Sequence, residues 1–259
     1  MNSTMRRLTL VICALPVLMA VNGAYLKSAR GEPPRFVIAA PGIAHSTFEI
    51  HPDDAEPFSG YAFKIDLDVA ELRLIPAGDP PSRRTVAQIV ASYPAVVAIN
   101  ASFFDTDGRA MGLAVDEGRS HGSGRRQSWG ALIVEERKAR ITLGSEISDQ
   151  LAPRLIVQGI PRLVVRGKVP GLKPQFAERS AVCADGSFVT LVVSTKVETT
   201  AFARFLADPP EKGGLGCLDA LNLDGGPSTQ LVVKLPGLER AVPGGWGVPN
   251  ALVAIPGKR

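Results

Sequence analysis

The chain has 259 residues, of which 45% are hydrophobic and 21% charged, and its formal net charge is +4 at pH 7. These values are typical of a globular protein with one large domain or two small ones. The charge is small, and no run of Lys and Arg is interleaved with aromatic residues. The composition therefore gives no indication of binding to nucleic acid, and we expect no nucleic-acid partner.

The N-terminus predicts export from the cytoplasm. Arg6 and Arg7 precede an apolar stretch over residues 8–21, and small or polar residues follow it. A basic head before a short apolar core is typical of a secretory signal, and the stretch is short for a membrane span. Cleavage after Gly23 or Ala24 would fit this pattern.

We therefore divide the chain into three parts. Residues 1–24 are expected to be a signal peptide or N-terminal anchor, residues 25–35 a linker, and residues 36–259 a soluble domain. The predicted location is periplasmic or secreted. No contact with a membrane is expected beyond such an anchor.

Two cysteines, Cys183 and Cys217, remain after the signal is removed. An oxidising compartment permits a disulfide between them. Two separate buried thiols are equally compatible with the sequence, since spacing along the chain does not give the distance that the bond requires.

Taken in chain order, the pattern predicts many short strands and few helices. Apolar and polar residues alternate over residues 61–70, which indicates a strand, and Asp185-Gly186 indicates a hairpin turn. Helices are expected over residues 85–93 and over residues 199–207, the second capped by Thr199 or Thr200. Strands are expected at residues 61–69, 72–76, 95–99, 129–135, 139–143, 155–158, 162–166, 181–184, 188–194, 220–223, 230–234 and 251–255. We predict an α+β class: a mixed, strand-rich single domain with a few helices packed on the sheet.

Polar residues follow or precede buried strands at two places where chemistry could occur. Asn100 comes directly after an apolar strand and can donate and accept hydrogen bonds, although capping the next turn would explain it equally well. Arg179, in Glu178-Arg179-Ser180, precedes another strand. Its planar guanidinium suits a phosphate, and a structural ion pair is the alternative.

A third polar cluster follows the apolar strand that ends at Leu223. It reads Asp224-Gly225-Gly226-Pro227-Ser228-Thr229. The two glycines let the backbone adopt unusual angles and let a ligand approach the N–H groups closely. The run is longer than a hairpin needs, so we interpret it as a site around Asp224.

Other motifs do not indicate a metal or a cofactor. Asp105-Thr106-Asp107-Gly108 lacks the distal glutamate of an EF-hand, and the three histidines are scattered. We predict that the protein needs neither. The segment 118–130 combines Gly and Ser with His121, Arg125 and Arg126. We favour a solvated loop there over one that closes on an anionic substrate.

The three clusters, in this order, resemble the phosphodiester glycosidase family, which includes the uncovering enzyme that removes N-acetylglucosamine from phosphomannose. The resemblance covers about residues 36–255. The matching segments are Asn100-Ala101-Ser102-Phe103-Phe104-Asp105, Gly112-Leu113, Gln158-Gly159-Ile160-Pro161, Arg179-Ser180-Ala181-Val182 and Leu221-Asn222-Leu223-Asp224-Gly225-Gly226. Ala101 and Ser102 stand where the family has a glycine pair, which places the substrate preference in question.

The resemblance implies a hydrolase that cuts the bond between a sugar's anomeric carbon and a phosphate in envelope or extracellular glycans. Asp224 would be the nucleophile or the base for water, Arg179 would hold the phosphate, and Asn100 would complete the catalytic set. The remaining substrate-binding residues would be Gln158, Ser180, Gly225, Gly226, Ser228 and Thr229.

Two other functions compete with this one. The same pocket would serve a non-catalytic carbohydrate-binding or exopolysaccharide-biogenesis protein, which would bind sugar phosphodiesters without turnover. A metal-dependent phosphoesterase would attack phosphorus rather than carbon and would lose activity in chelator.

Overall fold

The computed structural model describes residues 34–52, 55–78, 82–94, 96–148, 150–151 and 153–258. The predicted signal and most of the predicted linker lie outside these residues. Within them, no helix combines the length and the apolar character that crossing a membrane would require.

The largest sheet has seven antiparallel strands in the order β1-β2-β3-β13-β12-β14-β11. Its strands are β1 (Val37–Ala40), β2 (Ile43–Ile50), β3 (Phe58–Asp66), β11 (Arg162–Val164), β12 (Phe176–Asp185), β13 (Phe188–Glu198) and β14 (Asp219–Asn222). Asp185 pairs with Phe188 across a two-residue turn, which confirms the predicted hairpin.

Two smaller sheets complete the architecture, each with five strands. One has the order β7-β6-β10-β8-β9 and contains β6 (Ala114–Asp116), β7 (Arg119–Ser120), β8 (Gly130–Glu135), β9 (Lys138–Leu143) and β10 (Leu155–Gly159). The other has the order β16-β15-β5-β17-β4 and contains β4 (Glu71–Pro76), β5 (Val96–Asn100), β15 (Leu231–Leu235), β16 (Leu238–Val242) and β17 (Asn250–Ile255).

Helices are few in the described part of the chain. The two α-helices are α1 (Val86–Ile89) and α2 (Thr199–Ala207), and short 3-10 turns occupy Gly144–Glu146, Pro210–Lys212 and Gly226–Ser228. The extent of α2 is as predicted, but its cap is not a threonine. The Glu198 carboxylate accepts hydrogen bonds from Thr200 N at 2.7 Å and Ala201 N at 3.0 Å.

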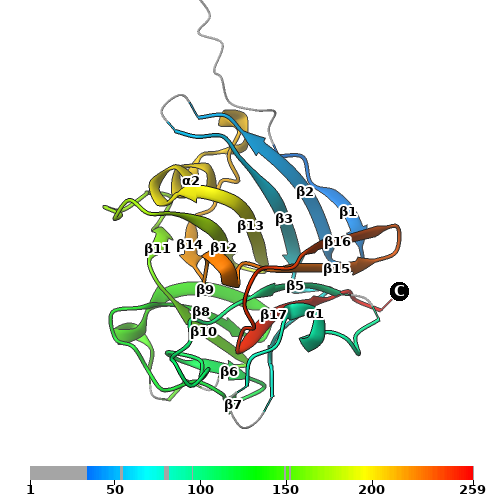
Figure 1. Ribbon diagram of the computed structural model, residues 1–259, viewed down its shortest axis with the longest axis vertical. Helices are drawn as coiled ribbons and strands as arrows, with labels where there is room; N and C mark the ends of the chain where they lie inside the picture. Colours follow the sequence, from blue (N-terminus) through cyan, green and yellow to red (C-terminus); the bar gives the residue numbers. More distant parts are fainter. Residues whose placement is uncertain are drawn as a thin grey trace, which may run out of the picture.

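The predicted α+β class is wrong, because the protein is mostly β. The helical pattern over residues 85–93 forms only the four residues of α1. The apolar faces of the strands cover one another, with three antiparallel sheets packed together, so little apolar surface remains for helices to cover. Figure 1 shows the seven-stranded sheet above the two smaller ones, with α2 lying against its other face.

The seven-stranded sheet buries both of its faces, in different ways. The face that we call the inner face joins the central core, a single buried cluster that includes Phe63 of this sheet and Leu132 and Ile99 of the two smaller sheets. The opposite, helix-covered face packs against α2 through residues such as Phe202 and Phe205.

Along β12 the side chains alternate between these faces, as a strand requires. Val182 and Ala184 belong to the inner core, and Ala181 and Cys183 belong to the helix-covered one. On that helix-covered side, Cys183 forms a disulfide with Cys217, with a Cα–Cα distance of 5.8 Å. The choice that the sequence left open is therefore settled in favour of the disulfide.

Candidate active site

The candidate site lies where the inner face of the large sheet meets the end of β5. Asn100 is the last residue of β5, and Asp224 follows β14 of the other sheet. The two are joined because Asn100 Nδ2 donates a hydrogen bond to Asp224 O at 2.7 Å, and Asp224 N donates to Ala101 O at 3.0 Å. Residues that are far apart in the sequence therefore form one polar cluster.

Asn100 is the centre of this cluster and is fully buried. Its Oδ1 accepts hydrogen bonds from Ser180 Oγ at 2.6 Å and from Gln230 N at 3.0 Å. With both acceptor positions and one amide hydrogen used inside the protein, Asn100 is held in a single orientation. These contacts make it a support for the Asp224 backbone.

The Asp224 carboxylate is half-buried, and its burial raises the pKa of the group. The Ser228 hydroxyl and the Gly225 N–H, which donates to Asp224 Oδ1 at 3.0 Å, act in the opposite direction. A carboxylate with a raised pKa at a strand end is typical of a group that moves a proton in a reaction.

The glycine pair shapes the loop beside this carboxylate. A Cβ on Gly225 would lie 2.8 Å from the carbonyl oxygen of Glu178, so a side chain there would require the loop to move. Gly226 has a φ of 58°, in the left-handed region that favours glycine. Among the hydrogen bonds of the described residues, none uses the N–H of Gly226, which leaves a donor close to Asp224.

Ser228 and Thr229 follow in the same loop, and both are buried. Ser228 N donates to Gly225 O at 3.2 Å and Thr229 N donates to Gly226 O at 2.9 Å, which fixes the turn. The Thr229 hydroxyl is buried without a hydrogen-bond partner among the described residues. A polar atom in that condition is a candidate for binding a ligand.

Arg179 does not join this cluster. It precedes Ser180 in β12 and shares the side of Ala181, so it points to the helix-covered face. Its Nη2 donates to Thr199 Oγ1 at 2.7 Å and also to Gln175 O. Burial lowers the pKa of this guanidinium, while nearby Glu198 raises it.

The side-chain amide of Gln158 also forms its hydrogen bonds with other residues of the protein. It is fully buried in β10, and its Oε1 accepts from Leu113 N and Arg126 N, both at 2.9 Å. Its Nε2 donates to Arg126 O at 2.8 Å. Gln158 therefore binds both the backbone N–H and the backbone carbonyl of Arg126, and so fixes the backbone of the segment 118–130 at Arg126.

Aromatic rings flank the loop that follows Asn100. Phe103 lies edge-on to Trp129, with centroids 5.5 Å apart, and the Arg126 guanidinium lies 5.8 Å from the Trp129 ring. Phe104 lies 6.5 Å from Trp246, which is 56% exposed. Aromatic side chains of this kind offer an apolar surface to a ligand. The two tryptophans had no sequence signal that pointed to a site.

Two further polar residues support the loop and were missed in the sequence. Gln230, besides bonding to Asn100, accepts a hydrogen bond from Val86 N at 2.8 Å. Asn250 accepts from Ser102 N at 2.9 Å and donates to Ser102 Oγ at 3.0 Å. Each stands directly before an apolar strand segment, a position at which a polar residue could have been singled out.

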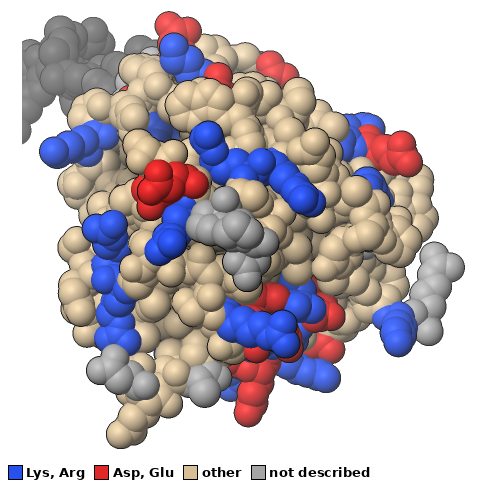
Figure 2. Space-filling model, turned by 60° about the horizontal axis from the view of Figure 1, so that its bottom comes forward, with Lys and Arg blue, Asp and Glu red and all other residues tan. Residues whose placement is uncertain are grey.

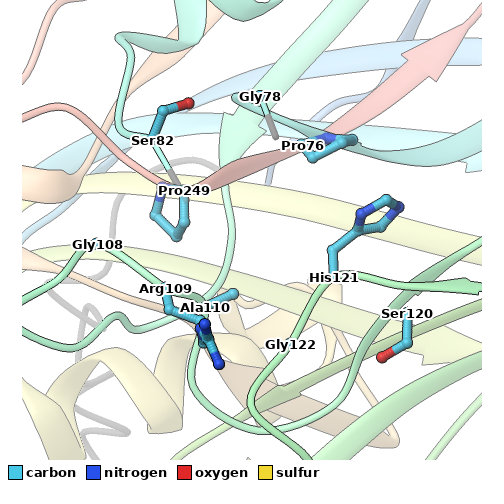
Figure 3. Close-up of a pocket in the computed structure, with 10 residues that line it drawn as sticks. All are labelled: Pro76, Gly78, Ser82, Gly108, Arg109, Ala110, Ser120, His121, Gly122 and Pro249. Carbon is cyan, nitrogen blue, oxygen red and sulfur yellow. The ribbon is translucent and has the colours of Figure 1, made fainter. Parts of the chain in front are cut away.

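A separate small pocket of about 240 Å³ lies beside the loop that contains Arg109. Figure 3 shows Ser82 and Pro249 on one side of it and Ser120 and His121 on the other. None of the predicted site residues lines this pocket. On the face of the molecule in Figure 2, Lys and Arg side chains lie in several separate groups, some next to acidic ones.

Metal ligands do not gather in the part of the chain that the structure describes, where no three His, Cys, Asp or Glu side chains lie together in a metal-binding arrangement. That a reaction proceeds without metal stays a prediction.

The sequence matches the family model described as phosphodiester glycosidase over residues 93–255, which is more than half of the chain. The chain therefore belongs to the phosphodiester glycosidase family. Among curated proteins, none matches it in sequence.

Solved structures share the fold. The catalytic domain of zebrafish N-acetylglucosamine-1-phosphodiester alpha-N-acetylglucosaminidase, auto-inhibited by its pro-peptide, is similar with a TM-score of 0.63 and 19% identity, over 88% of this chain and 89% of that one. A hypothetical protein from Synechocystis is similar with a TM-score of 0.58 and 18% identity, over 87% of this chain and 64% of that one.

Proposed function

We propose that this protein is a hydrolase that cleaves the bond between the anomeric carbon of a sugar and a phosphate in glycan phosphodiesters. Family membership over residues 93–255 supports the reaction class. The observation that carries the proposal is Asp224, whose backbone is fixed by Asn100 and Ala101 at the meeting point of two sheets and whose carboxylate has a raised pKa.

In the proposed reaction Asp224 acts as general base. Water attacks the anomeric carbon and gives a proton to the Asp224 carboxylate, while the bond from that carbon to the phosphate oxygen breaks. The phosphate leaves with the electron pair of this bond. A raised pKa makes the carboxylate a stronger proton acceptor, which suits a general base.

The leaving phosphate carries negative charge, and we assign two groups to it. The N–H of Gly226, in the Asp224 loop, is one. The Arg126 guanidinium, which lies beside the Trp129 ring and whose backbone is bonded to Gln158, is the other. Ser180 supports the site by holding Asn100 in place, and Ser228 lies in the same loop as Asp224, where its hydroxyl opposes the rise of the pKa of that carboxylate. We assign Arg179 to the support of α2, because its contacts lie on the helix-covered face.

The proposed location is periplasmic or extracellular, where the substrates would be envelope or secreted glycans. The disulfide between Cys183 and Cys217 supports this, since disulfides persist in oxidising compartments. The basic and apolar pattern of residues 1–24 agrees with it. The proposed reaction uses no cofactor and no metal, so activity should survive an excess of EDTA.

The test is to incubate the purified protein with a panel of sugar-1-phosphodiesters in oxygen-18 water and to identify the products by mass spectrometry. Heavy oxygen in the released sugar is the expected result, because the water attacks carbon. Heavy oxygen in the phosphate would replace the proposal with a phosphodiesterase. Binding of the panel without turnover would favour a carbohydrate-binding protein.

A further inference from the structure

A cavity of about 520 Å³ lies on the inner face of the seven-stranded sheet, next to the Asp224 loop. Its floor is formed by β2, β3 and β13, and Thr229 and Val242 close it from the side of β15 and β16. Glu178, whose carbonyl oxygen approaches Gly225, also lines it. The cavity therefore borders the candidate active site, although none of its floor residues was singled out in the sequence.

One row of paired residues leads from the active site into this cavity. The row begins at Ser180, which bonds to Asn100 and pairs with Val193 of β13. Val193 pairs with Tyr61 of β3, and Tyr61 pairs with Thr47 of β2. Neighbouring strands lie ~4.8 Å apart, so the row extends about 14 Å from Ser180. That distance accommodates two linked pyranose rings.

The lining has the chemistry of a sugar site. Tyr61 is half-buried, and its hydroxyl makes no hydrogen bond with the described residues. Thr229 is 3% exposed, and its hydroxyl is buried and has no partner among them. An aromatic ring and unpaired hydroxyls are groups that a polyhydroxylated ligand satisfies.

The charge of the lining residues indicates whether the cavity favours a neutral sugar or an anion. Glu49 and Glu178 line the cavity, and no Lys, Arg or His is among its described lining residues. A second phosphate would be repelled by these carboxylates, whereas a neutral glycan unit would not. The cation proposed for the scissile phosphate, Arg126, belongs to the loop between β7 and β8 and is absent from this lining.

We propose that this cavity is a binding subsite for a neutral, hydroxyl-rich glycan unit attached to the non-reducing side of the sugar that is cleaved from the phosphate. The inference rests on the proposed function for its position in the reaction. It identifies the substrate as an oligosaccharide joined to phosphate, with at least two sugar rings. Tyr61 provides the ring surface, and Thr229 provides a hydrogen bond.

Direct binding tests the cavity without reference to catalysis. Isothermal titration is performed with neutral disaccharides (chitobiose, cellobiose, maltose and mannobiose) on the wild type, on Tyr61→Ala and on Tyr93→Ala. Tyr93 is a half-buried tyrosine that packs in the separate core around α1 and is the matched control. At least one disaccharide should bind, and Tyr61→Ala should weaken it roughly tenfold, with no change for Tyr93→Ala.

A disaccharide with a phosphate on its non-reducing ring should bind at least tenfold more weakly at low ionic strength, because it meets Glu49 and Glu178. Binding of no neutral disaccharide, equal effects of the two tyrosine variants, or tighter binding of the phosphorylated sugar would each overturn the proposal.

Turnover separates this inference from the proposed function. A disaccharide-1-phosphodiester should be cleaved with a higher kcat/KM than its monosaccharide counterpart, and Tyr61→Ala should reduce that ratio roughly tenfold. Equal kcat/KM values for the two substrates would overturn the subsite and leave the glycosidase in place. Disaccharide binding that depends on Tyr61, without turnover of any phosphodiester, would overturn the function and support the subsite.

Discussion

The two faces of β12 differ in what their polar groups do. On the inner face, Ser180 bonds to Asn100, and the network ends at Asp224, a half-buried carboxylate beside a cavity. On the helix-covered face, Arg179 is bonded to the start of α2, and the disulfide of Cys183 lies on the same side. Adjacent residues of one strand thus belong to two separate systems.

We infer from this difference that the polar groups at the end of the inner face serve the proposed reaction, whereas those on the helix-covered face serve stability. The buried network on the inner face holds a charge where burial opposes it, which is typical of functional sites. The helix-covered face instead combines aromatic packing between Phe48 and Phe205, whose centroids are 4.4 Å apart, with a covalent link. Variants on the two faces should therefore affect different measurements.

The largest effect is expected on the inner face. Asp224→Asn should lower kcat on sugar phosphodiesters by about 10³-fold or more, because the proton acceptor is lost while the shape is kept. Asp219→Asn, at the other end of β14, is the matched control and should remain within twofold of the wild type. Near-normal turnover by Asp224→Asn would contradict the assignment of the base.

The next effect belongs to the helix-covered face. The disulfide joins residues 34 positions apart, and a loop of this length corresponds to about 3 to 4 kcal/mol of stability. The double variant Cys183→Ser, Cys217→Ser should lose about that much free energy of unfolding in urea, while kcat of the folded protein stays within twofold. A large fall in kcat with stability unchanged would mean that the faces are not separate.

A matched pair of arginine variants compares the faces directly. Arg126→Met should raise KM for sugar phosphodiesters about tenfold, since it removes the cation proposed for the phosphate. Arg179→Met should change KM less than twofold and should instead alter the melting temperature, because its contacts are with Thr199 and Gln175. A large rise in KM for Arg179→Met, with little change for Arg126→Met, would instead assign phosphate binding to Arg179.

The smallest effect concerns pH. Burial raises the pKa of Asp224 above its ordinary value of 3.8, so the folded protein holds this proton more tightly than the unfolded chain. Ionisation of Asp224 therefore costs stability above the raised pKa, and the cost disappears as the pH falls below 3.8. Asp224→Asn should melt at a higher temperature than the wild type at pH 7, and the difference should shrink towards pH 3.5 in calorimetry. A lower melting temperature at pH 7 would contradict a destabilising carboxylate.

Much of the fold could be predicted from the sequence, because the patterns are local. The alternation before Asp66, the hairpin at Asp185 and the helix over residues 199–207 all depend on neighbours in the chain. The class was wrong because the packing of sheet on sheet is not local. The Glu198 cap was missed because Thr199 and Thr200 are the more typical capping residues.

The sequence indicated several residues of the candidate site, but it did not indicate which of them are in contact. Asn100 and Asp224 each follow an apolar strand, and the structure places them in contact. Arg179 and Gln158 occupy family motif positions, but the sequence does not give the face on which a side chain lies or the partner that satisfies it. Trp129 gave no signal, since its proximity to Phe103 arises from the meeting of two sheets.

The position of β5 also constrains how the protein reaches its active form. This strand lies between β15 and β17, and Asn100 is bonded to Gln230, 130 residues further along the chain. Such distant pairing raises contact order and slows folding. Until the ribosome has delivered residues 224–230, Asn100 lacks its hydrogen bonds to Asp224 and Gln230, so a nascent or prematurely terminated chain has not assembled the candidate site.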